Sequence, residues 1–170
     1  MATSFKLEHD FSDIPLDIFL SHLLDPKLNQ MLKDGLSFDE RRLVERKETK
    51  GGMDWCFLVK KSVELPSAIK RILKADDLIW KEFSSFVRKD HCVYWKIVPE
   101  LKLVPLRGEG RSKFSKKQDG CKRIIEGQIT ADIPLVGKMV EAFIVNELLK
   151  SYDIEPGIER DFFRSIMGND

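Results

Sequence analysis

The chain has 170 residues, 42% of them hydrophobic, which suits one domain with a sizeable core. Its 29 Lys and Arg residues against 28 Asp and Glu leave a net charge of +1, and this near-neutrality excludes a global field for nucleic acid or membrane. No run approaches the roughly 20 apolar residues of a membrane span, and the start has no signal-peptide pattern, so we expect a cytoplasmic protein.

The first 35 residues predict a strand and two short helices. Residues 3–11 alternate with period two, which is typical of a strand. Pro15 suits the first turn of a helix, and the apolar residues that follow recur at helical spacing. Asp25-Pro26 restarts the chain as a second helix, for which Gly35 is a natural end. We therefore expect residues 15–35 to form two short helices.

Residues 36–133 predict about six antiparallel strands. Residues 36–48 and 53–61 flank a hairpin turn. Residues 65–73 fit either a short helix or an irregular crossing. Strands at 78–87 and 92–98 follow, and their inner face stays open because both faces carry aromatic residues.

The parity of the first of these hairpins assigns its faces. It puts Val44 on the same side as Trp55, Phe57 and Val59, together with the charged residues Glu40 and Arg42. Charge is unusual on a core side, so Glu40 and Arg42 fit either the mouth of a cavity or, more simply, a strand end that overhangs into solvent.

The last hairpin has a predicted register. A two-residue turn at Asp119-Gly120 pairs Phe114 with Ile125 on an apolar face. On the other face it pairs residues of complementary charge or polarity: Lys113 with Glu126, Arg111 with Gln128, and Arg107 with Asp132. A single register that satisfies both faces favours this pairing.

Three glycines share the predicted inner face of this hairpin, namely Gly108, Gly110 and Gly127. Glycine within a strand usually marks a sharp bend, a bulge or the close approach of another backbone. We interpret these glycines as leaving room beneath a curling sheet, and a plain bend with no ligand is the alternative.

The C-terminal region, residues 134–167, is predicted to be helical. Apolar residues cover most of the circumference of the helix that begins at residue 134, which predicts a mostly buried element. Pro156-Gly157 breaks or kinks this helix, and a last helical segment ends near residue 167.

This order of elements resembles the START-like (Bet v 1-like, polyketide cyclase-like) helix-grip superfamily over nearly the whole chain. The most specific segment is GQITADIPLVGKMVEAFIVNELL, residues 127–149, which looks like the final strand and the entry to the gripping helix. Within the superfamily the chain is most similar to an uncharacterised bacterial branch of unknown function. The resemblance implies an α+β fold in which a strongly curved antiparallel sheet of about seven strands wraps around a long C-terminal helix, with two short helices between the first two strands.

The resemblance also implies a hydrophobic cavity between the sheet and the helix. Members of the superfamily bind lipids, sterols, polyketides or hormones, and some are cyclases or aromatases. They share no catalytic motif, so no catalytic residue can be carried over, and function depends on the lining of the cavity. The residues that we expect to line it are Trp55, Phe57, Val59, Gly110, Phe114, Ile125, Ile129, Met139, Phe143 and Leu148.

The residue types of common catalytic and metal sites do not form motifs. The three histidines are scattered, Cys56, Cys92 and Cys121 lack zinc spacing, and neither HExxH nor GxSxG occurs. The cysteines, odd in number and far apart, are typical of reduced, buried thiols in an intracellular protein. The Gly-Glu-Gly at 108–110 lies within a strand, so it is not a phosphate loop. We expect no metal and no cofactor.

A basic stretch runs from Arg107 to Arg123, with seven basic and two acidic residues. An anionic headgroup or RNA could face such a stretch. The predicted pairing already uses several of these charges across the hairpin, and the outer face offers no aromatic side chain on which bases could stack. A solvated outer face is the preferred interpretation, and nucleic acid is not an expected partner.

Three functions follow. The first is non-catalytic binding or carriage of a small hydrophobic ligand such as a lipid, acyl chain, terpenoid or polyketide-like molecule, with transient membrane contact left open. The second is a cyclase or aromatase type of enzyme, which needs a buried acid or base in the cavity. Candidates for that group are Glu40, Arg42, Glu82, Tyr94 and His9. The third is a protein-interaction module with a filled core.

Overall fold

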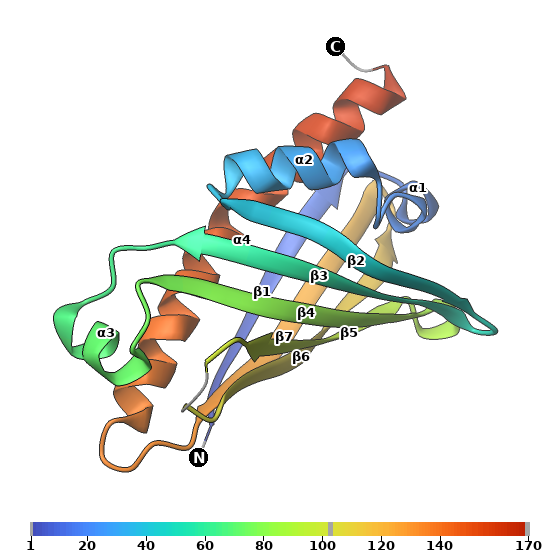
Figure 1. The fold of residues 1–170 in the computed structure, drawn as a ribbon. Coiled ribbons are helices and arrows are strands. Elements are labelled where there is room, and N and C mark those ends of the chain that lie inside the picture. Colours follow the sequence, from blue (N-terminus) through green and yellow to red (C-terminus); the bar gives the residue numbers. More distant parts are fainter. Residues whose placement is uncertain (1, 102–103, 169–170) are drawn as a thin grey trace.

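The computed structural model describes residues 2–101 and 104–168. Seven antiparallel strands form one strongly curved sheet with the order β1-β7-β6-β5-β4-β3-β2, and the long helix α4 lies across its concave side (Figure 1). The elements are β1 (Thr3–Ser12), α1 (Leu16–Ser21), α2 (Pro26–Gly35), β2 (Glu40–Thr49), β3 (Gly52–Ser62), α3 (Ser67–Leu73), β4 (Asp77–Val87), the 3-10 helix η1 (Arg88–Asp90), β5 (Cys92–Pro99), β6 (Leu106–Lys117), β7 (Gly120–Ala131) and α4 (Gly137–Met167). The α+β helix-grip prediction is confirmed.

The connections explain the strand order. Strands β2 to β7 follow one another as antiparallel neighbours, as short connections favour. Strand β1 instead pairs with β7, so the first and the last strand meet in the sheet. Residues 65–73, which the sequence left undecided, contain helix α3 (Figure 1). Helices α1 and α2 occupy the excursion between β1 and β2, as predicted.

The predicted register of the β6–β7 hairpin is wrong, although its faces are right. The turn consists of Gln118 and Asp119, and Lys117 pairs with Gly120. Gly120 is needed at the start of β7 because a Cβ there would lie 2.2 Å from the backbone oxygen of Phe11 in β1. The resulting shift places Phe114 opposite Arg123 instead of Ile125. A shift by two residues preserves which side chains face inward.

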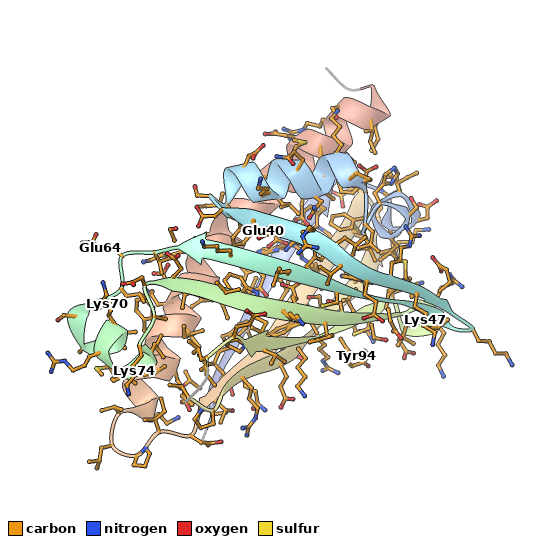
Figure 2. The ribbon with its side chains drawn as sticks, viewed as in Figure 1. Glu40, Lys47, Glu64, Lys70, Lys74 and Tyr94 are labelled. Carbon is orange, nitrogen blue, oxygen red and sulfur yellow. The ribbon has the colours of Figure 1, made fainter. Side chains whose placement is uncertain are left out.

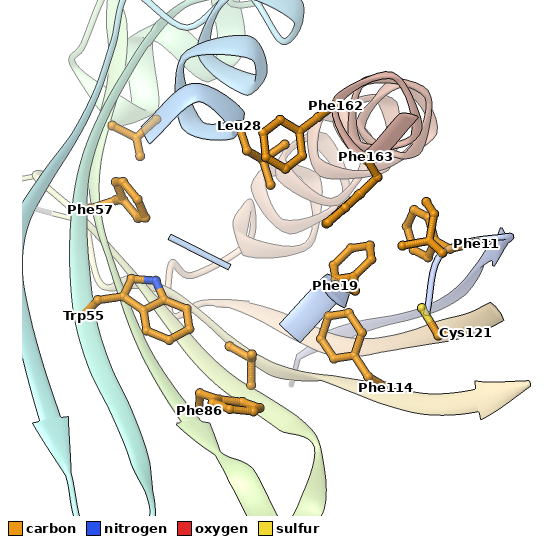
Figure 3. Packing of buried hydrophobic residues seen from close by; sticks show 13 residues of the cluster. Phe11, Phe19, Leu28, Trp55, Phe57, Phe86, Phe114, Cys121, Phe162 and Phe163 are labelled. Atoms are coloured by element: carbon orange, nitrogen blue, oxygen red, sulfur yellow. The ribbon is translucent and has the colours of Figure 1, made fainter. Parts of the chain in front are cut away.

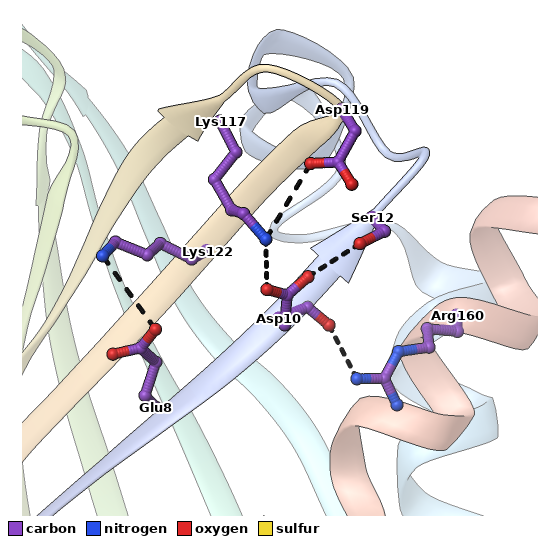
Figure 4. A network of polar contacts seen from close by, with 7 residues as sticks. All are labelled: Glu8, Asp10, Ser12, Lys117, Asp119, Lys122 and Arg160. Atoms are coloured by element: carbon purple, nitrogen blue, oxygen red, sulfur yellow. Dashed lines mark hydrogen bonds and ion pairs between the residues drawn. The ribbon is translucent and has the colours of Figure 1, made fainter.

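The outer charges of this hairpin pair in the shifted register. Arg111, and not Lys113, bridges Glu126 at 2.8 Å, and Gln128 donates to Glu109. The predicted contact between Arg107 and Asp132 forms, with 3.0 Å between Nη1 and Oδ2. At the hairpin tip, Lys117 reaches Asp10 of β1 (Figure 4). The basic stretch is therefore largely neutralised on its outer face.

A β-bulge overturns the predicted faces of β2. The pairing with β3 shifts between Leu43 and Glu45, so Val44 has no partner and the parity reverses beyond it. As a result Arg41, instead of Glu40 or Arg42, lies opposite Val59 on the concave side. Glu40 and Arg42 form a partly exposed ion pair with each other. They lie opposite Lys60 and Leu58 on the other face of the paired strand, so they are neither at the mouth of the cavity nor on an overhanging strand end.

Helix α4 continues through Pro156, so of the break or kink predicted there the break is wrong. Its concave-side residues are buried, whereas Met139, Leu149 and Ile154 are 43%, 37% and 52% exposed on the other side. The predicted burial over most of the circumference is therefore also wrong. Among residues 2–101 and 104–168 no strand covers the outer side of α4, so only one side of this helix faces the sheet (Figure 1).

The buried apolar residues form two clusters at opposite ends of the concave side. One cluster gathers phenylalanines from α1, β6 and the end of α4, including Phe19, Phe114 and Phe163 (Figure 3). The other surrounds Trp95, Ile125 and Ile129 near the start of α4. No helix within the described residues is both long and apolar enough to cross a membrane.

Candidate functional site

A cavity of about 230 Å³ lies between the concave face of the sheet and α4. Its walls come from β2 to β7, from the two short helices through residues such as Phe19 and Leu28, and from α4 through residues such as Ile144 and Leu148. Most of the lining is apolar. The volume is somewhat below the ~300–1,000 Å³ of typical ligand pockets, so the space fits a small molecule.

Six of the ten residues predicted to bind a ligand line this cavity, namely Trp55, Phe57, Phe114, Ile125, Ile129 and Leu148. The other four do not line it. Val59 is completely buried and Phe143 packs within the second cluster. Gly110 lies under an aromatic ring, and Met139 is 43% exposed. Ligand contact by the six remains a prediction.

The room above two of the inner-face glycines is filled by Trp95. A Cβ on Gly110 would lie 2.4 Å from Cζ2 of Trp95, and one on Gly127 would lie 2.5 Å from its Cη2. Gly110 and Gly127 are paired across β6 and β7, so together they seat one side of the indole. These glycines therefore serve close packing, and of the three only Gly108 borders the cavity.

All three tryptophans of the chain, Trp55, Trp80 and Trp95, line the cavity. Figure 3 shows Trp55 across the cluster from Phe19. The indole N–H groups of Trp80 and Trp95 are buried and have no hydrogen-bond acceptor within the described part of the chain. The lining thus combines a large aromatic surface with tryptophans whose indole N–H groups lack an acceptor.

One wall of the cavity is polar and comes from α4. Ser151, Tyr152, Glu155 and Glu159 line it, and their spacing places them on one side of the helix. Burial raises the pKa of the Tyr152 hydroxyl, which therefore stays neutral. This polar stripe was not predicted from the sequence, although the spacing of its residues was a signal that could have revealed it.

Arg123 of β7 holds this polar wall to the sheet. Its Nη1 and Nη2 donate to the two carboxylate oxygens of Glu159 at 2.8 and 2.9 Å, and Nη2 lies 3.2 Å from Glu155. Arg123 is 5% exposed, and its guanidinium lies over the ring of Phe11 at 5.2 Å. Burial raises the pKa of Glu159, while the Arg123 charge opposes that shift.

The burial of Arg123 corrects its assignment to the basic outer face. In β7 it has the same parity as Ile125 and Ile129, which the sequence already placed inside. The parity of Arg123 therefore indicated an inward side chain, whereas the number of basic residues in this stretch indicated an outward one. Its partner is a carboxylate on α4, far away in the sequence, which strand patterning alone does not reveal.

His9 completes the group around Arg123. Its Nδ1 accepts from Arg123 at 2.7 Å, and its ring also forms a hydrogen bond with the backbone of Tyr152. That carbonyl is free because Pro156, four residues later, has no N–H. Burial, followed by the charge of Arg123, lowers the pKa of His9 to about 4. His9 lies behind the cavity wall, which argues against the catalytic role considered for it.

Glu82 and Arg41 are the other interior charges of the cavity. Glu82 projects inward from β4, and burial raises the pKa of its carboxyl, with the nearby charge of Arg41 opposing the shift. The Arg41 guanidinium lies 4.2 Å from the centre of the Phe57 ring, and its Nε donates to Asn29 of α2. Of the candidates for an acid or base, Glu82 is thus the one that reaches the cavity.

Tyr94, another of those candidates, points the other way. It is 44% exposed on the outer side of the sheet (Figure 2), and with Lys96 and Arg111 it borders a shallow outer hollow. Cys56, Cys92 and Cys121 are free and buried. The described residues contain no cluster of His, Cys, Asp and Glu able to hold a metal ion.

The arrangement can enclose an apolar body and offer polar contacts along two walls. The sheet supplies indole N–H donors and Glu82, and α4 supplies a tyrosine and carboxyl groups. Buried carboxyls with raised pKa retain protons closer to neutral pH and can exchange them with a bound molecule. Binding and acid–base chemistry are therefore both compatible with the cavity.

Comparison with solved structures shows what the fold is similar to. TTHA0849 from Thermus thermophilus is 12% identical with a TM-score of 0.67, and the match covers 99% of this chain and 100% of that one. The ZhuI aromatase/cyclase from Streptomyces sp. R1128 is 10% identical with a TM-score of 0.63, covering 96% of both chains. Ara h 8.0201 is 11% identical with a TM-score of 0.58, covering 92% of this chain and 97% of that one. At such identities the likeness establishes the fold.

Comparison of the sequence with protein families gives a direct assignment. No curated protein matches the chain. The model of the family described as "Protein of unknown function (DUF2505)" matches residues 7–161. Because this match spans most of the sequence, the protein belongs to the DUF2505 family, within the helix-grip, SRPBCC-type fold.

Proposed function

We propose that the protein binds a small, mostly apolar molecule in the cavity between the sheet and α4. The observation that carries this proposal is the cavity itself, about 230 Å³ and lined mainly by apolar and aromatic side chains. A ligand that enters it removes apolar surface from water, at roughly 25 cal/mol per Å². The structural neighbours include an aromatase/cyclase, which is compatible with such a role.

The size and shape of the cavity narrow the ligand. Aromatic rings from β3, β4 and β5 face the apolar part of α4 across the space. A flat molecule of one or two rings, or a short branched chain, matches this lining better than a long extended acyl chain. The interaction-module hypothesis required a filled core, so the cavity weighs against it.

The three tryptophans provide the assay. Purified protein is examined by native mass spectrometry for a co-purified molecule, and the emptied protein is titrated with 2-acetylnaphthalene while tryptophan emission is followed. We expect saturable quenching, because every tryptophan in the chain borders the cavity. A protein that carries nothing and gives no saturable response would contradict the proposal.

Neighbouring residues of β6 offer a matched pair of variants. Ser112 lines the cavity, whereas Lys113 is exposed on the outer face. Ser112→Phe should weaken the naphthalene probe by about tenfold or more, since forcing an added ring into an occupied space costs about 1–3 kcal/mol. Lys113→Phe should leave binding unchanged. Equal affinity in both variants would place the probe elsewhere.

A cyclase or aromatase type of enzyme is the second candidate, and the buried Glu82 carboxyl favours it. An acid or base for such chemistry must lie within the cavity, where Glu82 does lie. We expect wild-type protein in D₂O to speed the exchange of methyl protons of bound 2-acetylnaphthalene, with Glu82 accepting the proton and a deuteron returning. Glu82→Gln should abolish the effect and Lys81→Gln should preserve it. Exchange no faster than in buffer would rule out this candidate.

A further inference from the structure

Two buried donors on the sheet wall of the cavity have no acceptor. The Nε1–H groups of Trp80 and Trp95 are shielded from solvent and make no hydrogen bond within the described residues. Trp95 is only 7% exposed. Buried donors are satisfied in the large majority of cases, and leaving one without a partner is unfavourable. These two N–H groups therefore mark a place where an acceptor is missing.

The packing of Trp95 prevents it from turning elsewhere to find a partner. The benzo side of its ring is seated against Gly110 and Gly127, where even a Cβ would clash. Phe5 stacks against the indole with 6.2 Å between ring centroids. The ring is thus held in one orientation by the sheet itself.

Trp80 belongs to the same wall. It projects inward from β4 on the same face as Glu82 and Ser84, and Ser84 is the residue opposite Trp95 in the pairing of β4 with β5. The ring of Phe38 meets Trp80 edge-on at 5.9 Å. Both residues line the cavity, so a molecule bound there lies beside the two side chains that carry these donors.

The interior charges of the cavity argue against an anionic ligand. Arg123 is already bound by Glu155 and Glu159, and Arg41 donates to Asn29 while its charge opposes the raised pKa of Glu82. Lys61 and Arg107 also border the space, but Arg107 is held outside by Asp132 and Lys61 lies over the ring of Phe38. The lining thus has four basic residues and four carboxyl groups, including that of Glu147. Burial disfavours the charged form of Glu82, and it would disfavour a ligand carboxylate in the same mostly apolar space.

We propose that the cavity is selective for a neutral, one- or two-ring molecule whose carbonyl oxygen accepts a hydrogen bond from the indole N–H of Trp95 or Trp80. This inference rests on the proposed binding function and adds the chemical class of the ligand. The carbonyl oxygen of the ligand, placed on the sheet side, would be the acceptor that the indole N–H lacks. The ring system of the ligand would occupy the apolar space toward α4. A pure hydrocarbon would leave both donors without a partner.

Three naphthalene probes of similar size separate these possibilities: 2-acetylnaphthalene, 2-isopropenylnaphthalene and 2-naphthoate. They differ in carrying a neutral acceptor, no acceptor or a negative charge. In calorimetric titrations of the wild-type protein the ketone should bind about three- to tenfold more tightly than the hydrocarbon, as one neutral hydrogen bond gives. The naphthoate should bind most weakly.

Variants test which groups give the preference. Trp95→Phe and Trp80→Phe each keep an aromatic ring and remove the N–H. The preference for the ketone over the hydrocarbon should disappear in at least one of them. Phe57→Leu, which changes the lining without removing a donor, should weaken both probes equally and keep the preference. An unchanged preference in both tryptophan variants would overturn the proposal.

A measurement on the wild-type protein protects the test against a variant that fails to fold. In ¹H–¹⁵N spectra the indole N–H signal of Trp95 or Trp80 should move downfield with the ketone and not with the hydrocarbon. The absence of such a shift would overturn the proposal, as would tighter binding of 2-naphthoate. Hydrocarbon binding without a preference would refute the ligand class alone, whereas failure of all three probes to bind would refute the proposed function as well.

Discussion

Replacement of Arg123 by methionine is the sharpest test of the buried polar group. The substitution keeps most of the side-chain volume and removes the only guanidinium that contacts Glu159 within the described residues. Glu159 is 4% exposed and would lose two hydrogen bonds of 2.8 and 2.9 Å at once. Glu155 would lose its contact at 3.2 Å. Two carboxyl groups would then share a buried site without a cation.

The expected cost is large. Removing one partner of a buried ion pair typically destabilises a protein by about 3–5 kcal/mol, and a domain has only about 5–15 kcal/mol in total. The cost should also depend on pH. Burial holds the pKa of the Glu159 carboxyl above its unfolded value of 4.5, and losing Arg123 raises it further. The folded variant therefore retains a proton that the unfolded chain releases above about pH 4.5, so the variant loses stability as pH rises.

Urea denaturation at pH 5 and pH 8 measures both effects. The loss of unfolding free energy in Arg123→Met should be larger at pH 8, and adding Glu159→Gln should recover part of it. Arg111→Met is the matched control, because Arg111 on the neighbouring strand bridges Glu126 at 2.8 Å on the exposed face. Its loss should be far smaller. A similar loss in the two arginine variants, or the same loss at both pH values, would refute the reasoning.

Three further outcomes are expected in the same denaturation assay. Glu141→Gln should lower the free energy of unfolding by about 1.5–3 kcal/mol at pH 7, because the buried carboxylate accepts a hydrogen bond from the Ala131 amide at 3.0 Å. Burial raises the pKa of Glu141, but the hydrogen bonds to its carboxylate outweigh burial and hold the pKa at about 2. The loss of stability should therefore shrink as pH falls from 4.5 toward 2. Gly110→Ala should cost about 1–3 kcal/mol by forcing a Cβ against Trp95, whereas Gly51→Ala, with nothing near its Cβ, should change little. In the wild type the pKa of His9 is lowered from 6.5 to about 4, so only the unfolded chain gains this proton as pH falls through 6.5. The stability of the wild type should therefore decline as pH falls to about 4. His9→Gln should flatten that decline, and equal slopes in the two proteins would argue against a lowered pKa of His9.

Sequence periodicity was sufficient for most of the elements and their order, although helix α3 stayed undecided. The alternation in β1 and β7 and the apolar run that begins α4 each reflect burial on one side of an element, which local sequence records directly. The faces of the last hairpin were also predictable, because side-chain direction has a period of two. Its register was not predictable, since Gly120 fits a turn and a close strand contact equally well, and the contact with Phe11 of β1 decides between them.

The polar part of the candidate site escaped prediction for a different reason. The bulge at Val44 turned Arg41 inward in place of Glu40 and Arg42, and an extra residue in a strand leaves no clear local signal. Arg123 had the parity of an inner residue, but a buried arginine is acceptable only with a buried partner. That partner, Glu159, is supplied by α4 and cannot be recognised from the strand alone.

Pro156 shows why the local rule for proline did not decide between a break in α4 and a continuous helix. Proline removes one helical hydrogen bond, and for an isolated helix that loss favours a break. Here the carbonyl of Tyr152 that loses its partner receives a hydrogen bond from His9, whose other nitrogen accepts from Arg123. The strand thus satisfies the defect in the helix, and the same contact draws α4 toward β1 and β7. The sheet therefore supplies the hydrogen bond that Pro156 removes from the helix, and the same two residues, His9 and Arg123, connect this part of α4 to the polar wall of the cavity.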